Sequence, residues 1–388
     1  MSFLICFGLW LRPACAQILG LNVALPKVVI RLNPQVSISA INRDYKTTLA
    51  DQVPGTQIYD LTIPAGLDIL RFVQILAADP RIAYAEPDIT LTECTGNPFT
   101  FAYDSGGAPG SYASQPAYDM IHLGQSQKFT NGAGVIVAVL DTGAKLDHPA
   151  LAGHFTTGYN AIQPDQPPLD LPDGRNNNGV GHGTFISGIL AQVAPGAAIM
   201  PVRVLNGDGV GTLMNVLKGL YYASAHGAQV INMSFGALEH LPALIEALHV
   251  ARGLGIVLVA ASGNENTVEA QFPAICPDVL AVASIESDRT RASYSNYGRH
   301  IALVAPGTAV RSTYWDGGYT CWSGTSFAAP FIAAEAVLLL GLGSHPDVSA
   351  VEDAILATAH SVDDVNPDYA GKLGVGLIDI QAAVYRLR

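Results

Sequence analysis

The sequence predicts an α/β protein: a three-layer α/β/α sandwich with a mostly parallel sheet, preceded by a small α+β unit. Three observations support this fold class. From about residue 118, short apolar runs recur without alternating polar residues, which is typical of strands covered on both faces. Segments with helical spacing lie between these runs. The 388-residue chain is 49% hydrophobic and only 13% charged, so it can bury a large core.

Residues 118–388 contain the elements of the expected sandwich. Its helices include residues 213–225 and 243–252. Its strands are expected at residues 135–140, 199–205, 230–233, 256–260 and 279–283.

Residues 17–93 are interpreted as the α+β unit. A helix is expected over 67–78, where apolar residues recur at helical spacing until Asp79-Pro80. Strands are expected at residues 28–32, 56–63 and 82–91. Residues 94–117 are rich in Gly, Pro, Ser and aromatic residues, which indicates a linker.

Composition and charge exclude three classes of protein. A disordered chain needs low hydrophobicity, and a nucleic-acid-binding protein needs a basic field, whereas the net charge here is −12. A membrane-spanning helix needs about 18 consecutive apolar residues. The internal apolar run at 254–261 is too short, and Glu335 interrupts the run at 331–342. We therefore expect no nucleic-acid partner and no stable membrane insertion.

The first sixteen residues resemble a secretory signal peptide. Residues 3–11 are apolar, and Ala14-Cys15-Ala16 suits cleavage before Gln17. The segment predicts a secreted or periplasmic protein. The run has no preceding Lys or Arg, so a buried N-terminal strand and a wrongly chosen start codon are the alternatives. Arg12 and Pro13 disfavour a lipid anchor on Cys15.

The five cysteines include no CxxC pair, so the sequence predicts neither a zinc knuckle nor a thioredoxin-type site. In an exported protein Cys276 and Cys321 can form a disulfide. Two separate buried thiols are the alternative, and the sequence does not decide between them.

Three residues have the types and positions of a nucleophilic triad. Asp141 follows an expected strand, while His182 and Ser326 each begin an apolar helix. A neutral serine hydroxyl is a poor nucleophile, and it needs an imidazole to take its proton and a carboxylate to orient the imidazole. Taken singly, the three can be a turn residue, a core histidine and a helix N-cap.

The motifs around these residues resemble those of the subtilisin-like serine proteases. They are VLDTGAKLDHP, GHGTFISGILA, INMSFG, ASGNEN and SGTSFAAP, in that family's order, within residues 118–388. The resemblance implies a serine endopeptidase with Asp141, His182 and Ser326 as its triad. It also implies that the Asn264 amide and the Ser326 N–H stabilise the oxyanion. No cofactor is implied.

The resemblance extends to a substrate cleft in which an extended peptide lies between two strands. The alternative is that the glycines of these segments only form turns. The implied cleft residues are Gly209, Val210 and Gly211 on one wall, Ser234, Phe235 and Gly236 on the other, and Ala261, Ser262 and Gly263 at the floor.

Residues 17–93 resemble the propeptides of the same family, which assist folding and then inhibit the protease. The resemblance implies an autoprocessed zymogen, with cleavage between Thr92 and Gln115 and Cys94 at the junction. The expected partners are a peptide or protein substrate and the protein's own propeptide. A permanently attached domain is the alternative.

The chain also departs from the family. Many members carry a calcium-binding insertion after the helix that begins at His182, and here Ala194-Pro195-Gly196 follows that helix directly, so this site is expected to be absent. The stretch 170–178 is interpreted as a polar loop, with a cation site as the alternative. No metal-ligand spacing such as HExxH occurs, so no metal site is predicted.

Further expectations concern single residues. Phe185 and Phe331 replace family histidines and are expected in one apolar cluster behind the triad. Glu335 lies in an apolar helix and needs solvent or a partner. Asp147 and His148 are expected in a surface loop. Ordinary solvated or core roles are expected for seven further histidines: His154, His226, His240, His249, His300, His345 and His360.

Two further functions remain open. One is a catalytically inactive pseudo-protease that binds peptides, which the intact triad and Asn264 disfavour. The other is a narrow processing protease that acts on one partner precursor.

Overall fold

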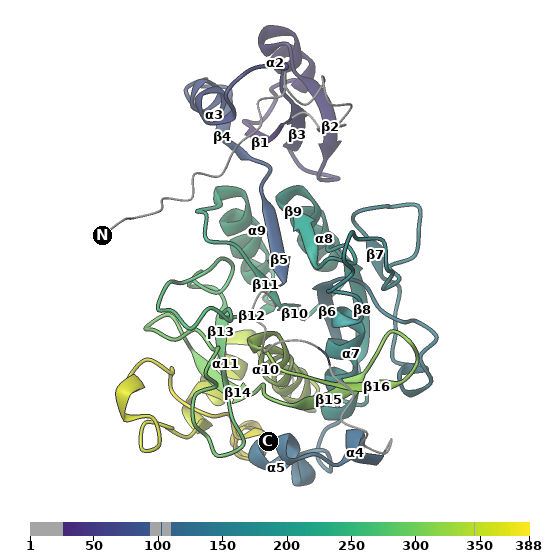
Figure 1. Ribbon diagram of the computed structural model, residues 1–388, viewed down its shortest axis with the longest axis vertical. Coiled ribbons are helices and arrows are strands. Elements are labelled where there is room, and N and C mark those ends of the chain that lie inside the picture. The colour runs from purple at the N-terminus through teal and green to yellow at the C-terminus, as the bar shows by residue number, and fades with distance from the viewer. Residues whose placement is uncertain (1–25, 94–101, 103–109, 345) are drawn as a thin grey trace, which may run out of the picture. The chain divides into compact units, whose positions relative to one another are not determined.

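The computed structural model describes residues 26–93, 102, 110–344 and 346–388, which form two compact units divided between Ile89 and Thr90 (Figure 1). The expected signal peptide, residues 1–16, and most of the linker, 94–101 and 103–109, lie outside the described residues. Within the described residues, no helix has the length and apolar character that crossing a membrane requires.

The first unit is an α+β fold, as predicted. Helix α3 (Ile69–Ala77) packs on its sheet, and Asp68 caps this helix by accepting the Arg71 N–H at 2.8 Å. A second helix, α2 (Ile38–Tyr45), was not predicted. The sheet is antiparallel and has the order β2-β3-β1-β4, with β1 (Lys27–Leu32), β2 (Thr48–Gln52), β3 (Ile58–Thr62) and β4 (Ile82–Pro87).

The single strand expected over residues 82–91 is wrong, because the structure divides it into two strands. Strand β4 ends at Pro87, which has no N–H to continue the ladder. The following strand, β5 (Thr90–Glu93), belongs to the second unit and pairs there with β9 and β11.

The second unit contains a seven-stranded sheet in which every pairing is parallel. The five predicted strands are confirmed, and β7 and β14 extend the sheet at its two edges. Its order is β14-β13-β12-β10-β6-β8-β7, with β6 (Ile136–Asp141), β7 (Tyr159–Asn160), β8 (Ala198–Arg203), β10 (Val230–Met233), β12 (Val257–Ala261), β13 (Leu280–Ile285) and β14 (Leu303–Pro306).

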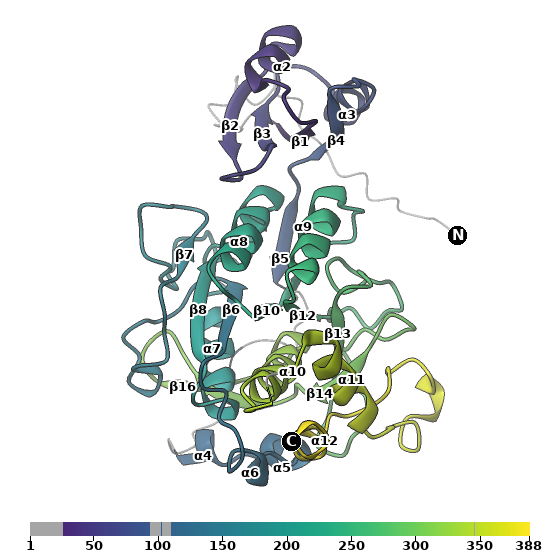
Figure 2. The same ribbon diagram turned by 180° about the vertical axis from the view of Figure 1, so that it is seen from behind.

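Helices cover both faces of this sheet, which makes the predicted three layers (Figures 1 and 2). On one face α7 (His182–Val193) and α10 (Thr325–Leu340) pack against each other, and on the other lie α8 (Leu213–Ala225) and α9 (Pro242–Gly253). Helix α10 is buried from Thr325 to Leu339, because α11 (Val348–Thr358) and α12 (Ile380–Leu387) cover it. Burial on all sides explains its long apolar run.

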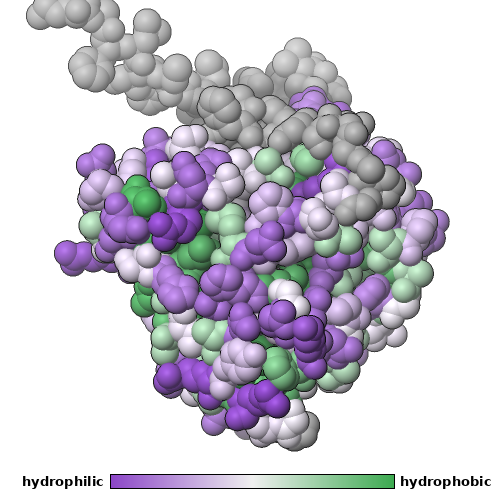
Figure 3. Space-filling view, turned by 90° about the horizontal axis from the view of Figure 1, so that it is seen from below, coloured by the Kyte–Doolittle hydropathy of each residue, from purple (hydrophilic) through white to green (hydrophobic). Residues whose placement is uncertain are grey.

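Two small sheets complete the unit. Strand β5 lies between β9 (Val210–Thr212) and β11 (Phe235–Gly236), and both pairings are antiparallel. Strands β15 (Val310–Thr313) and β16 (Tyr319–Trp322) form a hairpin that packs on α7. Three short helices precede β6: α4 (Gly110–Ala113), α5 (Pro116–Met120) and α6 (Leu123–Ser126). Helix α4 and the start of α5 lie within residues 94–117, so the last residues of the predicted linker are helical. The face seen in Figure 3 is largely hydrophilic, with small apolar groups between the polar residues.

Candidate active site

Three elements of the second unit bring the predicted triad residues to one place. Asp141 is the last residue of β6, His182 the first residue of α7 and Ser326 the second residue of α10. The two helices pack against each other, and α7 also packs on β6. All three residues are fully buried. Functional groups collect in this way at the carboxyl ends of parallel strands.

Asp141 and His182 form a short, buried ion pair. The imidazole Nδ1 lies 2.8 Å from one carboxylate oxygen of Asp141 and 3.0 Å from the other. The Thr142 N–H donates to the first of these oxygens at 2.8 Å and so fixes the carboxylate. Because Nδ1 faces the carboxylate, it carries a proton, and Nε2 is the nitrogen that can exchange one.

Ser326 lies beside this pair without a hydrogen bond to it. Its hydroxyl donates to the carbonyl oxygen of Ser234 at 3.3 Å, and His182 Nε2 has no hydrogen-bond partner among the described residues. Catalytic hydrogen bonds in substrate-free sites are often loose and tighten in the complex. The rings of Trp322 and Phe327, with centroids 5.5 and 5.2 Å from that of His182 and 5.1 Å from each other, pack against the imidazole.

Glu93, at the end of β5, is a site residue that the sequence did not predict. Its carboxylate lies 3.7 Å from His182 Nδ1. Burial lowers the pKa of His182, but the charges of Asp141, Glu93 and Asp170 outweigh burial and raise that pKa to about 9. With Glu93 in place, the imidazole is therefore protonated at neutral pH. The strand register that brings Glu93 here depends on the break at Pro87, which the sequence analysis missed.

Asp170 is a second residue that the sequence did not predict. This fully buried carboxylate accepts the Gly181 N–H at 2.9 Å and the Thr184 hydroxyl at 2.7 Å. These contacts fix the first turn of α7 and thereby the position of His182. Burial raises the pKa of Asp170, and the hydrogen bonds oppose that rise. The sequence feature that could have pointed to Asp170 is its position in the polar stretch 170–178, shortly before the helix that begins at His182.

Asn264 lies next to the N-terminus of α10. Its side-chain oxygen accepts both the backbone N–H and the hydroxyl of Thr325 at 2.9 Å. This arrangement fixes the amide plane and assigns the NH₂ group as its donor end. Ser326 N–H belongs to the first turn of α10, where backbone donors have no partner within the helix.

The two predicted cleft walls lie on either side of β5. In the register, Leu91 pairs with Gly211, Thr92 with Val210 and Gly236. The Glu93 N–H donates to the Gly209 carbonyl at 2.8 Å. A Cβ on Gly209 would overlap the Glu93 side chain, and its φ of +72° also favours glycine.

The predicted floor follows β12 directly. Ala261 ends this strand, and the Ser262 carbonyl accepts the Asn296 side-chain amide at 3.0 Å. Gly263 has a φ of +104°, and its N–H donates to the Thr325 hydroxyl at 3.2 Å. The segment therefore connects the sheet to the Asn264 and Ser326 region.

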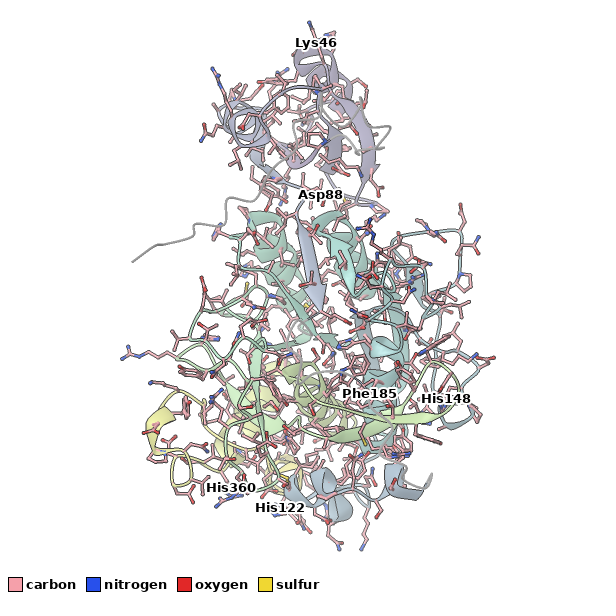
Figure 4. The ribbon with its side chains drawn as sticks, in the orientation of Figure 1. Lys46, Asp88, His122, His148, Phe185 and His360 are labelled. Carbon is pink, nitrogen blue, oxygen red and sulfur yellow. The ribbon has the colours of Figure 1, made fainter. Side chains whose placement is uncertain are left out.

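The structure corrects one expectation near the site. His148 is not on the surface, because it is 1% exposed and its Nε2 donates to the Gly318 carbonyl at 2.9 Å, while Nδ1 accepts the Ala150 N–H (Figure 4). Its neighbour Asp147 is exposed, as predicted, and pairs with Lys145 at 2.9 Å. The polar sequence around His148 concealed its burial.

The structure also bears on the two phenylalanines and the two cysteines singled out in the sequence. Phe185 and Phe331 both belong to the extended buried core of the second unit, in which the Phe185 ring lies tilted against Phe327 at 4.6 Å between centroids and Phe331 contacts Tyr118. Cys276 and Cys321 are separate buried thiols.

Glu335 has neither the solvent exposure nor the hydrogen-bond partner that a charged carboxylate would need. It is fully buried, and its carboxylate oxygens have no hydrogen-bond partner among the described residues. Burial, with a contribution from the charge of Asp379, raises its pKa well above 4.5. The side chain therefore lies in the core in its neutral form.

Two sequence profiles match the chain. The profile of the Subtilase family matches residues 132–376, and that of the Fervidolysin N-terminal prodomain matches residues 27–88.

Individual relatives agree with these profiles. Thermitase from Thermoactinomyces vulgaris is 36% identical over 252 residues, which is 62% of this chain and 87% of thermitase. Subtilisin NAT from Bacillus subtilis subsp. natto is 32% identical over 385 residues, covering 95% of this chain and 93% of that protein.

The structure is similar to a solved structure, that of fervidolysin from Fervidobacterium pennivorans, which is described as a keratinolytic enzyme related to subtilisin. The two superimpose with a TM-score of 0.74 at 24% sequence identity, and the match covers 93% of this chain and 61% of that chain. At this identity the likeness supports the fold alone.

Proposed function

The chain belongs to the subtilase family of serine endopeptidases, and from this premise we propose that Ser326, His182 and Asp141 hydrolyse peptide bonds through an acyl-enzyme. The observation that carries the proposal is the buried pair of His182 and Asp141, with Ser326 adjacent on the neighbouring helix. A buried carboxylate that fixes Nδ1 leaves Nε2 to act on the serine.

Each step of the reaction uses a group already described. Ser326 Oγ attacks the scissile carbonyl carbon while His182 Nε2 takes the hydroxyl proton. His182 then gives this proton to the leaving amine, and the ester of Ser326 remains. Water, deprotonated by His182, attacks the ester carbon; His182 then returns this proton to Ser326 Oγ as the ester bond breaks and the acid product leaves. Asp141 stabilises the imidazolium formed in each half of the reaction.

Asn264 and the Ser326 backbone N–H are proposed as the oxyanion donors. Support comes from the Thr325 contacts, which hold the Asn264 side-chain oxygen and so set the orientation of its NH₂ group. Donors fixed before the reaction stabilise the developing charge without reorganisation.

We assign Gly209–Gly211, Ser234–Gly236 and Ala261–Gly263 to substrate binding. The support is the pairing of β5 with β9 and β11, because an extended peptide substrate makes the same kind of antiparallel contacts. By this argument β5 occupies the place of the substrate, and residues 17–93 act as an inhibitory propeptide that the protease removes between Thr92 and Gln115.

The propeptide proposal places four segments along the chain: a signal peptide at 1–16, the propeptide at 17–93, a processing region at 94–117 and the protease at 118–388. Secretion is the corresponding localisation. N-terminal sequencing of the product recovered outside an expressing cell tests signal and propeptide removal together. A product that begins at Met1 or Gln17 contradicts the processing scheme.

Catalysis is proposed to need no metal. Many subtilases bind calcium, but the residues after α7 do not fit such a site, since only residues 194–197 lie before β8 and none has a side-chain oxygen. In the 170–178 loop, Asp173 accepts the Gly207 N–H at 2.8 Å and pairs with Arg203 at 2.7 Å. These contacts support a polar loop stabilised by its own hydrogen bonds.

Hydrolysis of casein by the processed protein tests the activity. Broad digestion that is lost in Ser326→Ala supports a general endopeptidase. Cleavage restricted to one precursor would favour the narrow processing protease, and binding of peptides without cleavage would favour the inactive pseudo-protease.

A further inference from the structure

Two histidines and an aspartate converge at one point of the second unit, apart from the triad. His122 Nδ1 and His360 Nε2 each lie 2.9 Å from the same carboxylate oxygen of Asp379. The three ligand atoms all lie within 4.8 Å of one another. Figure 4 shows His122 and His360 side by side, at the end of the unit remote from β5.

The backbone holds all three residues in place. Asp379 caps α12, and its other oxygen accepts the Ala382 N–H at 2.9 Å. His360 exchanges two backbone hydrogen bonds of 2.8 Å with Leu377. His122 is the N-cap residue of α6 and lies in the left-handed region with a φ of +52°, a conformation that is uncommon for residues other than glycine.

We propose that His122, His360 and Asp379 form a binding site for a divalent transition metal of the zinc type. Two imidazole nitrogens and one carboxylate oxygen make the donor set that zinc accepts at sites with an open fourth position. Calcium prefers six to eight oxygen ligands and does not suit two imidazoles. The nitrogens would bind the ion in place of the protons that they now share with Asp379.

Exposure favours entry of the ion from solvent. The histidine side chains are 52% and 60% exposed, whereas that of Asp379 is 10% exposed. Donors at about 2.1 Å from a tetrahedral zinc lie about 3.4 Å apart. The two nitrogens are 2.9 Å from the shared carboxylate oxygen and within 4.8 Å of each other, so binding requires them to move away from that oxygen and to approach the same spacing from each other. Water can occupy the fourth position on the exposed side.

The bound ion would join three segments that are distant in sequence. These are the start of α6, the segment around His360 and the start of α12. A ligand that binds the folded state alone raises stability in proportion to the logarithm of its concentration. The function we infer is structural, since the site would fasten the C-terminal helix to the rest of the unit.

Zinc titration by calorimetry tests the site, with the full chain carrying Ser326→Ala to prevent self-digestion. The variants His122→Asn and His360→Gln each keep an amide N–H donor for Asp379 but lose the imidazole. Asn also tolerates the left-handed backbone of position 122. We expect one tight zinc ion per chain and at least a tenfold loss of affinity in each variant, with unchanged melting temperatures in the absence of metal.

His249→Asn is the matched control, because His249 forms a similar exposed pair with Asp278 at 3.1 Å in which no second histidine takes part. This variant is expected to bind zinc like the parent. The proposal is overturned if the parent binds no zinc, or if zinc affinity stays unchanged in both His122→Asn and His360→Gln.

Discussion

The Glu93 carboxylate of β5 lies 3.7 Å from Nδ1 of His182, the same nitrogen that pairs with Asp141. The contact gives β5, which we propose lies in the substrate cleft, a direct electrostatic effect on the proposed general base. A protonated His182 cannot accept the proton of Ser326. In the proposed zymogen, β5 therefore both blocks substrate and holds the base in its inactive form.

Glu93→Gln is expected to lower the pKa of His182 from about 9, because it removes one of the negative charges that raise it. NMR titration of the His182 imidazole in the Ser326→Ala background measures the change. Glu269→Gln, which changes an exposed surface residue, is the control and should leave the pKa of His182 unchanged. A His182 pKa that is equal in both variants would contradict the electrostatic role of Glu93.

Stability should follow the same linkage. The folded-state pKa of His182 is raised, so its stabilising contribution is complete below pH 6.5 and is lost as the pH rises through about 9. The free energy of unfolding should therefore fall over this range, and fall less steeply in Glu93→Gln than in the parent. Denaturant unfolding at a series of pH values measures both slopes.

Asn264→Ala is expected to reduce kcat by about 10² to 10³-fold with a small change in KM, because an oxyanion donor acts mainly in the transition state. The substitution also removes the acceptor for Thr325. Thr325→Val serves as the control for that loss, since it keeps Asn264 and removes the Thr325 hydroxyl, which donates to Asn264 and accepts the Gly263 N–H. Steady-state kinetics on a peptide substrate separate the two effects, and equal losses would argue against the Asn264 role.

Glu335→Gln is expected to remove a pH dependence of stability. The unfolded chain ionises Glu335 near pH 4.5, while the folded state keeps it neutral to a much higher pH. Stability should fall above pH 4.5 by up to about 1.4 kcal/mol per pH unit until the folded-state pKa is reached. Denaturant unfolding should show this slope in the parent and in the exposed control Glu239→Gln, and its persistence in Glu335→Gln would refute the assignment.

Gly209→Ala tests the fit of the cleft wall. The added Cβ would overlap the Glu93 side chain and requires an unfavourable backbone conformation at φ +72°. We expect kcat/KM for extended peptides to fall by at least tenfold. Gly317→Ala, a glycine with φ +90° and open space around its Cβ, controls for backbone strain alone. Similar kinetics for the two variants would show that close approach to the substrate is unimportant.

The sequence predicted the sheet and the triad because their signals are local. Continuous apolar runs mark β6 and β12, and the residues proposed for catalysis lie at the ends of such strands or begin the apolar helices. Glu93 and Asp170 could not be found in this way. Their roles depend on long-range register and on a loop that folds back to α7, which no periodicity encodes.

The cluster of His122, His360 and Asp379 shows the same limit. These residues are far apart in the chain, and their approach depends on the pairing of residues 360 and 377 and on the cap of α12. The burial of His148 was missed for a similar reason, since its partner Gly318 lies in the connection between β15 and β16.

Covalent labelling by a fluorophosphonate probe tests the central claim most directly, because only an activated serine reacts. The account predicts that the processed protein takes up one probe per chain, that peptide mapping places it on Ser326, and that His182→Ala abolishes labelling while Ser326 remains present. Failure of correctly processed protein to label, or equal labelling in His182→Ala, would contradict it.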